Sequence, residues 1–243
     1  ESQSFNAVLR SSHTSGVLSL TNRNLSQIPL QIFSADLDSQ EKFWECVPLS
    51  KLDLSFNQIT SIPNEISTLE ELLSMKIRSN NLNELNTMLF ESCIMLKQLD
   101  VGQNHLTNVS EKIGHLQQLI EFSAPENKIN SLPSQLEMCK QLQILNLYSN
   151  NLTSLPELDL PNLVQINVGK NKLRGIPQSF ANCKSIEVFI CCRNQIQHLP
   201  DLTYMRSLKV VDAMENRIEV FPLLPSEGNT SLSILNLGYN FLH

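Results

Sequence analysis

A pattern of leucines and one asparagine, LxxLxLxxNxL, recurs along almost the whole chain and constrains its fold more than any other feature. It starts at residues 49, 72, 96, 119, 142, 163, 186, 208 and 232, and its asparagines follow one another at steps of 21 to 24 residues. A degenerate copy at residues 16–25, GVLSLTNRNL, has Arg23 at the asparagine position. Ten repeats of this period predict a solenoid, in which each repeat is stable only against its neighbours.

Each repeat is expected to contribute one short strand. Leu145 and Leu147 alternate, so both side chains point to the same face of an extended segment. The chain then turns away, which leaves backbone groups inside the coil that cost about 1–3 kcal/mol each when unpaired. An asparagine side chain both donates and accepts, so we expect it to point inward and bind this turn. The expected ladder contains Asn57, Asn80, Asn104, Asn127, Asn150, Asn171, Asn194, Asn216 and Asn240.

The segment after each asparagine is predicted to form the outer side of the coil. A Leu–Pro or similar pair, such as Ile62–Pro63, halts strand pairing there, and apolar residues then return every three positions, which indicates a helical or 3-10 turn. The repeats at Leu85–Asn86 and Val109–Ser110 lack this proline. The shortest step, from Asn150 to Asn171, predicts an extended outer segment at residues 156–163.

These motifs identify the chain as similar to the leucine-rich repeat family. The resemblance implies an α/β solenoid with a parallel concave sheet of about ten strands and short helical, 3-10 or extended convex segments. The 23-residue form with its Leu–Pro pair resembles the intracellular Ras-group repeat proteins. The first sixty or so residues, with SGVLSLTNRNLSQIP, then EKFWE, then LSKLDLSFN, look like one particular animal member of the family.

We expect residues 1–243 to form a single domain. Phe5, Val8 and Leu9 predict an N-terminal cover over residues 1–15, and the long step after Arg23 predicts an insertion at residues 34–48. Phe43 and Trp44 in that insertion are expected to plug the convex side, with a partner-binding wedge as the alternative. The sequence ends directly after its last repeat, so we expect a fragment without its C-terminal cap; alternatively this end pairs with another copy. Otherwise we expect a monomer.

The composition limits the classes of partner and the cellular compartment that we expect for this protein. The formal charge of −6 and the pI of about 5.4 argue against nucleic acid, and no apolar run is long enough to cross a membrane. The six cysteines include no CxxC pair, and three recur at one place in the repeat, which is typical of buried thiols in a reducing compartment. We therefore expect a cytoplasmic protein, with the nucleus as the alternative.

We find no sequence signature of chemistry. The glycines form neither a GxGxxG nor a Walker motif, and HExxH is absent. The five histidines fall at unrelated places in the repeat, so we expect no metal and no cofactor. Cys191 and Cys192 are adjacent, but the strand alternation turns them to opposite faces. The sequence therefore favours a protein that is not an enzyme.

The outward side chains of the strands are the candidate binding residues. Near the N-terminal side, Lys76 and Arg78 are expected between Asp53 and Asp100, either as a self-paired charge ladder or as part of a binding patch. Toward the C-terminal side, apolar and aromatic residues edged by charges favour a protein-binding surface, although ordinary surfaces also hold some apolar residues. The candidates are Phe56, Lys76, Arg78, Tyr148, Ile190, Arg193, Met214 and Tyr239.

Glycines at 102, 169 and 238 share one outward position. They admit the backbone of a partner, or they are neutral. Together these observations predict a non-catalytic scaffold or adaptor that holds a protein partner on a preformed concave face. The alternative is the recognition or sensor arm of a larger enzyme such as a kinase, GTPase or ubiquitin ligase. An extracellular recognition module is disfavoured because no cysteine caps are present.

Overall fold

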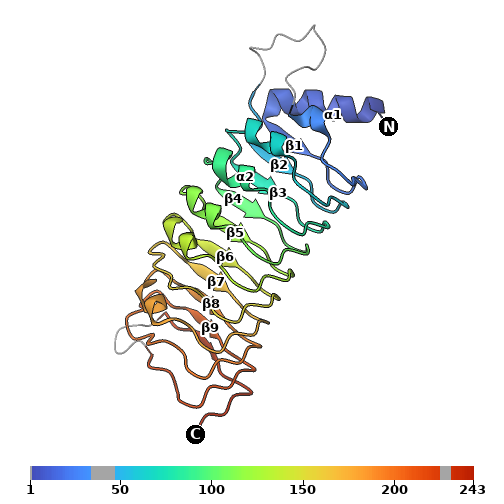
Figure 1. Ribbon diagram of the computed structural model, residues 1–243. Helices are drawn as coiled ribbons and strands as arrows, with labels where there is room; N and C mark the ends of the chain where they lie inside the picture. The colour runs from blue at the N-terminus through green and yellow to red at the C-terminus, as the bar shows by residue number, and fades with distance from the viewer. Residues whose placement is uncertain (1, 34–46, 225–230) are drawn as a thin grey trace.

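The computed structural model describes residues 2–33, 47–224 and 231–243. Its strands form one parallel sheet in which each strand pairs with the next along the chain, and Figure 1 shows them stacked side by side. This architecture confirms the predicted leucine-rich solenoid. The strands are β1 (Val17–Ser19), β2 (Lys51–Asp53), β3 (Ser74–Lys76), β4 (Gln98–Asp100), β5 (Glu121–Ser123), β6 (Ile144–Asn146), β7 (Gln165–Asn167), β8 (Val188–Ile190), β9 (Val210–Asp212) and β10 (Ile234–Asn236).

Short helical segments lie on the opposite side of the coil from the sheet (Figure 1). The step between Asn150 and Asn171 contains no helix among the described residues, as its shorter length predicted. The helices are α1 (Ser2–Ser15), α2 (Thr87–Ser92) and the 3-10 helices η1 (Leu30–Ile32), η3 (Asn64–Thr68), η4 (Glu111–His115), η5 (Ser134–Met138) and η6 (Gln178–Asn182). In the described part of the chain, no helix has the length and hydropathy needed to cross a membrane.

Each convex helix begins where the sequence supplies a stop for the strand. Pro63 precedes η3 and Pro133 precedes η5, since a fixed φ and a missing N–H suit the start of a helix. The two repeats without proline use a side-chain cap instead. Asn86 accepts a hydrogen bond from Met88 N at 2.9 Å, and Ser110 accepts one from Lys112 N at 3.2 Å.

The core runs through the middle of the coil as columns of inward side chains. The central residue of β2 to β9 is buried in every repeat, and the strand register places these residues opposite one another. Phe180 of η6 packs against Phe189 of β8 with ring centroids 4.7 Å apart, which joins the convex side to the sheet. Because each column is continuous, the apolar area that stabilises one repeat is supplied by its neighbours.

The asparagine side chains all make the same hydrogen bonds. Asn127 Nδ2 donates to the carbonyl oxygens of Val101, Ala124 and Pro125 at 3.0 to 3.3 Å. Its Oδ1 accepts from Leu106 N at 3.0 Å, in the preceding repeat. The other eight asparagines of the repeat each donate to three carbonyls and accept from a preceding N–H in the same way. These amides therefore both close each turn and join successive repeats.

The residue before each of these asparagines has a left-handed backbone, with φ between 53° and 59°. None of them is glycine, although this conformation costs other residues about 1–2 kcal/mol. The outward residues at this position, Phe56, Arg193 and Tyr239 among them, therefore lie on a turn at the edge of the sheet and not on the strand itself. The asparagine that follows holds the turn by hydrogen bonds, and this offsets the backbone cost.

The two ends of the sheet differ. Helix α1 lies at the β1 end, where Leu9 is buried and Phe5 and Val8 pack partly against the core. Gly16, at φ +66°, ends this helix, and its N–H donates to Ser12 O at 2.8 Å. At the β10 end, the inward Leu235 and Leu237 are only partly buried. Phe43 and Trp44 lie outside the described residues.

Candidate functional site: the concave face

The concave face is the solvent side of the sheet together with the turn residues along its edge. Phe56, Lys76 and Arg78 lie at one end of it and form the N-terminal patch. Phe56 is 57% exposed, and its N–H donates to Arg78 O, so the two side chains leave adjacent turns. Beside them lies a shallow hollow of about 270 Å³ between β1 and β4. It is lined by Val17, Leu18, Ser19, Lys51, Leu52, Asp53, Ser74, Lys76 and Gln98.

Arg78 belongs to a polar network that crosses three repeats. Its Nε donates to Gln103 Oε1 at 3.3 Å, and its Nη2 lies 3.8 Å from Glu126 Oε1. Gln103 in turn accepts from Ser79 Oγ and donates to Glu126 at 3.1 Å. The guanidinium is thus in contact with polar groups of the next two repeats.

The aspartates near this patch do not form the charge ladder that was one of the two alternatives for it. Asp53 Oδ1 accepts from Ser55 N at 3.0 Å, and Asp100 Oδ1 accepts from Gly102 N at 3.0 Å. An aspartate commonly binds the backbone two residues on in this way, which fixes the end of the strand. Lys76 makes none of the ion pairs found in the described residues. Its ammonium group is therefore open to a partner.

Tyr148, Ile190, Arg193, Met214 and Tyr239 form the C-terminal patch. The strand register puts Ile190 of β8 beside Asp212 of β9, and Met214 lies just beyond that strand. Ile190 and Met214 are half-buried, whereas Tyr239 is 82% exposed. Arg193 Nε binds Glu215 Oε1 at 3.2 Å on the neighbouring turn. The patch therefore combines an apolar floor with a charged edge.

The space above two of the glycines is filled by neighbouring side chains. A Cβ at Gly169 would lie 3.3 Å from Tyr148 Cδ2 and 3.2 Å from Cys192 Sγ, and a Cβ at Gly102 would lie 3.0 Å from the Pro125 ring. This favours a third reading beside the two that the sequence left open, in which Gly102 and Gly169 make room for residues of this chain. Tyr148, which is separated in sequence from the rest of the C-terminal patch, reaches it across Gly169.

Cys191 and Cys192 hold the two thiols of this region, and burial raises the pKa of both. Cys191 is fully buried, and its adjacent Cys192 is partly exposed on the concave face, as the strand alternation predicted. Burial and the neighbouring Asp212 raise the pKa of Cys192 to about 11. Among the described residues, no group of histidine, cysteine, aspartate and glutamate side chains is arranged to hold a metal ion.

Sequence reasoning placed the candidate residues in two groups but missed the contacts that orient them. It did not include Gln103 or Glu126, which contact the Arg78 guanidinium. A single polar residue on a surface leaves no periodic signal in the sequence. The two groups do not meet: Phe56, Lys76 and Arg78 lie around β2 and β3, and Ile190, Arg193, Met214 and Tyr239 lie around β8 to β10. The face between them is mostly polar.

A curved coil of parallel strands, closed by a ladder of asparagines and open on its sheet side, defines a leucine-rich repeat solenoid, a fold that commonly serves as a protein-interaction module. Comparison with known families agrees: residues 47–106 and residues 141–163 each match a family model described as leucine rich repeat. These matches support a leucine-rich repeat protein. Both describe the repeat itself, and neither indicates a catalytic family.

Several solved structures have a similar coil. A leucine-rich repeat protein from Leptospira interrogans has a TM-score of 0.67 at 25% identity, over 97% of this chain and 69% of that one. YopM from Yersinia enterocolitica has a TM-score of 0.66 at 25% identity, over 90% of this chain and 45% of its own. The ectodomain of the Arabidopsis thaliana receptor kinase GASSHO1/SCHENGEN3, in complex with CASPARIAN STRIP INTEGRITY FACTOR 2, has a TM-score of 0.76 at 26% identity, over 89% and 26%.

Proposed function

We propose that this chain is a non-catalytic scaffold or adaptor that binds a protein partner on its concave face. The observation that carries the proposal is the C-terminal patch, in which Ile190, Met214 and the exposed Tyr239 lie together on a solvent-facing surface. Apolar and aromatic side chains with an arginine at their edge are the composition found at the centre of protein interfaces. The N-terminal patch, with Phe56 and the unpaired Lys76, offers a second anchor on the same face.

Rigidity favours binding by this surface. Each turn is fixed by an asparagine, and Arg78 and Arg193 each pair with a glutamate of a neighbouring repeat, so part of the ordering that binding requires is already present. Ordering a flexible side chain costs about 0.5–1.5 kcal/mol, and a preformed surface avoids much of that cost. The complex of the receptor-kinase ectodomain with its integrity factor shows that a coil of similar shape binds another molecule.

A second candidate is that the chain is the recognition arm of a larger enzyme. The receptor-kinase ectodomain favours this reading, because there a similar coil forms part of a kinase. The chain spans 26% of that ectodomain and 45% of YopM. The sequence of the full-length protein separates the candidates, since a kinase, GTPase or ubiquitin-ligase domain beyond His243 would establish the second.

We place the protein in the cytoplasm, with the nucleus as the alternative, because its described cysteines are free thiols and three of them are buried at one repeat position. The opening residues support a more specific proposal: they resemble those of the animal leucine-rich repeat-containing protein 40. We further propose that it acts as a monomer and does not bind nucleic acid, given its net charge of −6.

Changing Met214 and Tyr239 together to aspartate tests the proposed surface. We expect the double variant to fold normally and to retain about a tenth of the captured partner, because two charges then oppose the burial of the apolar patch. The measurement is affinity capture from cell lysate followed by mass spectrometry. The matched control changes Met138 and Tyr204 to aspartate, since both are exposed on the convex side.

Reversing the charges of Lys76 and Arg78 to glutamate probes the N-terminal patch in the same assay. Its control is the same reversal at Lys128 and Lys172, which are exposed outside both patches. A set of captured proteins that is identical for wild type and for both concave variants would show that the partner does not bind this face.

A further inference from the structure

The flank of the solenoid, defined by the exposed turn residues just before each strand, carries an apolar pair where its neighbours are polar. Ile94 and Met95 precede β4 and are 50% and 46% exposed. The same two positions hold glutamates 70 and 71 before β3 and glutamines 117 and 118 before β5, all exposed. Ile94 and Met95 thus expose apolar surface that the repeat itself does not require.

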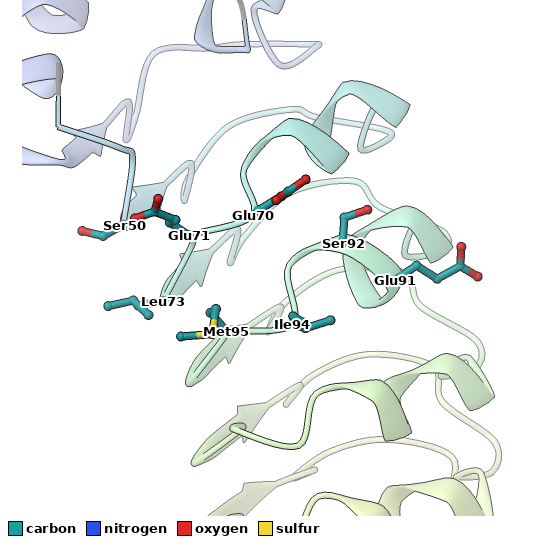
Figure 2. A pocket seen from close by; sticks show the side chains of 8 residues that line it. All are labelled: Ser50, Glu70, Glu71, Leu73, Glu91, Ser92, Ile94 and Met95. Atoms are coloured by element: carbon teal, nitrogen blue, oxygen red, sulfur yellow. The ribbon is translucent and has the colours of Figure 1, made fainter. Parts of the chain in front are cut away.

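These residues line a groove of about 760 Å³ on the flank. Figure 2 shows Leu73, Met95 and Ile94 in the lower row of the view, with carboxylate-bearing side chains above them. Leu73 is half-buried, and the next repeat has Lys97 at the same position. Leu73, Ile94 and Met95 together form an apolar strip along the groove. The groove is lined by Ser50, Glu70, Glu71, Leu73, Glu91, Ser92, Ile94 and Met95.

The repeat that supplies Ile94 and Met95 differs from its neighbours in length and in its convex helix. The step from Asn80 to Asn104 has 24 residues, one more than the steps on either side. The extra residue is accommodated by α2, a six-residue α-helix between the five-residue 3-10 helices η3 and η4. The end of α2 carries Glu91 and Ser92 to the rim of the groove (Figure 2).

The rim carries uncompensated negative charge. Glu91 is neutralised by Lys112, whose Nζ lies 3.1 Å from Glu91 Oε1. Glu70 and Glu71 form none of the ion pairs in the described ranges, and no lysine or arginine lines the groove. Two exposed carboxylates therefore stand beside an apolar strip.

We propose that this groove is a second interaction site, which binds a basic amphipathic segment of a partner protein. Its chemistry matches arginines or lysines that alternate with aliphatic residues. The aliphatic side chains and the methylene stems of the basic residues cover Leu73, Ile94 and Met95, while the cationic ends reach Glu70 and Glu71. The unbranched thioether of Met95 adapts to side chains of different shape. The site lies on a different side of the coil from the concave patches and does not depend on them.

The methionines allow the site to be tested directly in solution. The chain has six methionines, so labelling their methyl carbons with ¹³C gives a simple NMR spectrum. Met95 reports on the flank groove, Met214 on the concave face and Met138 on the convex side away from both. The probe is a short peptide in which arginine and leucine alternate, and its control is the same peptide with glutamate in place of arginine. We expect the first peptide to shift the Met95 signal saturably and to leave the Met214 and Met138 signals in place.

Two double variants identify the groups responsible, with binding measured by fluorescence anisotropy of the labelled peptide. Ile94→Gln with Met95→Gln copies the pair found at residues 117–118 in the next repeat, so the fold is expected to be retained, and we expect binding to weaken about tenfold or more. Glu70→Gln with Glu71→Gln is expected to weaken binding up to about tenfold at low salt. Glu137→Gln with Glu157→Gln removes the same charge elsewhere on exposed positions and is expected to have no effect.

Three outcomes would overturn the proposal. The first is that the Met95 signal stays in place throughout the titration with the arginine peptide. The second is that the glutamate peptide shifts this signal equally, and the third is that both double variants bind the peptide like wild type. A shift at Met214 alone would assign the peptide to the concave face, so it would refute the flank site while leaving the function proposed for that face intact. Loss of partner capture by the concave variants, in turn, has no bearing on the Met95 signal.

Discussion

Replacing Asn127 by alanine is expected to lower the free energy of unfolding by about 2–4 kcal/mol. The amide is the acceptor for Leu106 N, a group that lies inside the coil and has no other partner among the described hydrogen bonds. In the variant, Val101 O still accepts a hydrogen bond from Asn104 Nδ2, and Ala124 O still accepts one from Asn150 Nδ2. These two carbonyls therefore lose only one of their hydrogen bonds. The cost is therefore dominated by one buried N–H and by weaker coupling between two repeats.

The matched control is Asn130→Ala, three residues further along the same turn. Asn130 is exposed, and within the described chain its side chain makes no hydrogen bond, so we expect a change within about 0.5 kcal/mol. Urea unfolding followed by circular dichroism measures both variants, and hydrogen exchange at the Leu106 amide locates the effect. Equal midpoints for Asn127→Ala and Asn130→Ala would show that the inward amide does not stabilise the coil.

Changing Gly114 to alanine is expected to destabilise the protein by about 1–3 kcal/mol, because it forces two packed repeats apart. Gly114 is buried in η4, and a Cβ there would lie 2.9 Å from Gln135 O, a backbone atom of η5 that has no freedom to withdraw. Met138 Sδ, at 3.0 Å, is the end of a flexible side chain and is able to move. The destabilisation therefore measures how tightly the convex helices are stacked.

Gly175→Ala is the control for this substitution. A Cβ at Gly175 meets nothing within 4 Å, and its backbone is not left-handed, so alanine fits without strain. Both variants change the unfolded chain in the same way, and we expect Gly175→Ala to be neutral or stabilising by up to about 1 kcal/mol. A thermal midpoint for Gly114→Ala that equals or exceeds that of Gly175→Ala would contradict tight stacking of η4 on η5.

The fold was predictable because the same short sequence pattern, which indicates a strand followed by a turn, recurs along the chain. Leu145 and Leu147 define the strand, Asn150 defines the turn, and Pro156 ends the pairing, and the same assignments recur at a fixed period. A single repeat would be ambiguous, since a short apolar run also fits a helix. Repetition removes that ambiguity, because only a stacked coil buries all copies at once.

The details that the pattern left out have local causes with weak sequence signals. The left-handed turn before each asparagine is occupied by residues as different as Phe56, Lys170 and Tyr239, so no glycine marks it. Asn86 and Ser110 stand where other repeats have proline and cap the helices α2 and η4 with their side chains. This capping depends on the position of a backbone N–H, which the sequence pattern does not give.

The candidate site was predictable as columns of outward residues but not as a surface. The strand period places Tyr148 outward, yet only the structure shows that its ring lies against Gly169, where a Cβ would be 3.3 Å from Tyr148 Cδ2. The flank groove does have a signal in the sequence, namely Ile94 and Met95 where adjacent repeats have Glu–Glu and Gln–Gln. Reading that signal requires knowing that these positions face solvent, which depends on how the turns before the strands pack.

Three cysteines occupy one position on the convex side of alternate repeats. The thiols of Cys93, Cys139 and Cys183 donate to carbonyl oxygens of the preceding repeat, those of Ile66, Ile113 and Leu158, at 3.4 to 3.7 Å. Burial raises the pKa of Cys93 to about 11 and of Cys139 to about 12, and it also raises the pKa of Cys183. A thiol-specific label therefore reaches each one only after its repeat has separated from the one before it. The order in which the three become labelled during mild denaturation would reveal from which end the coil begins to fray.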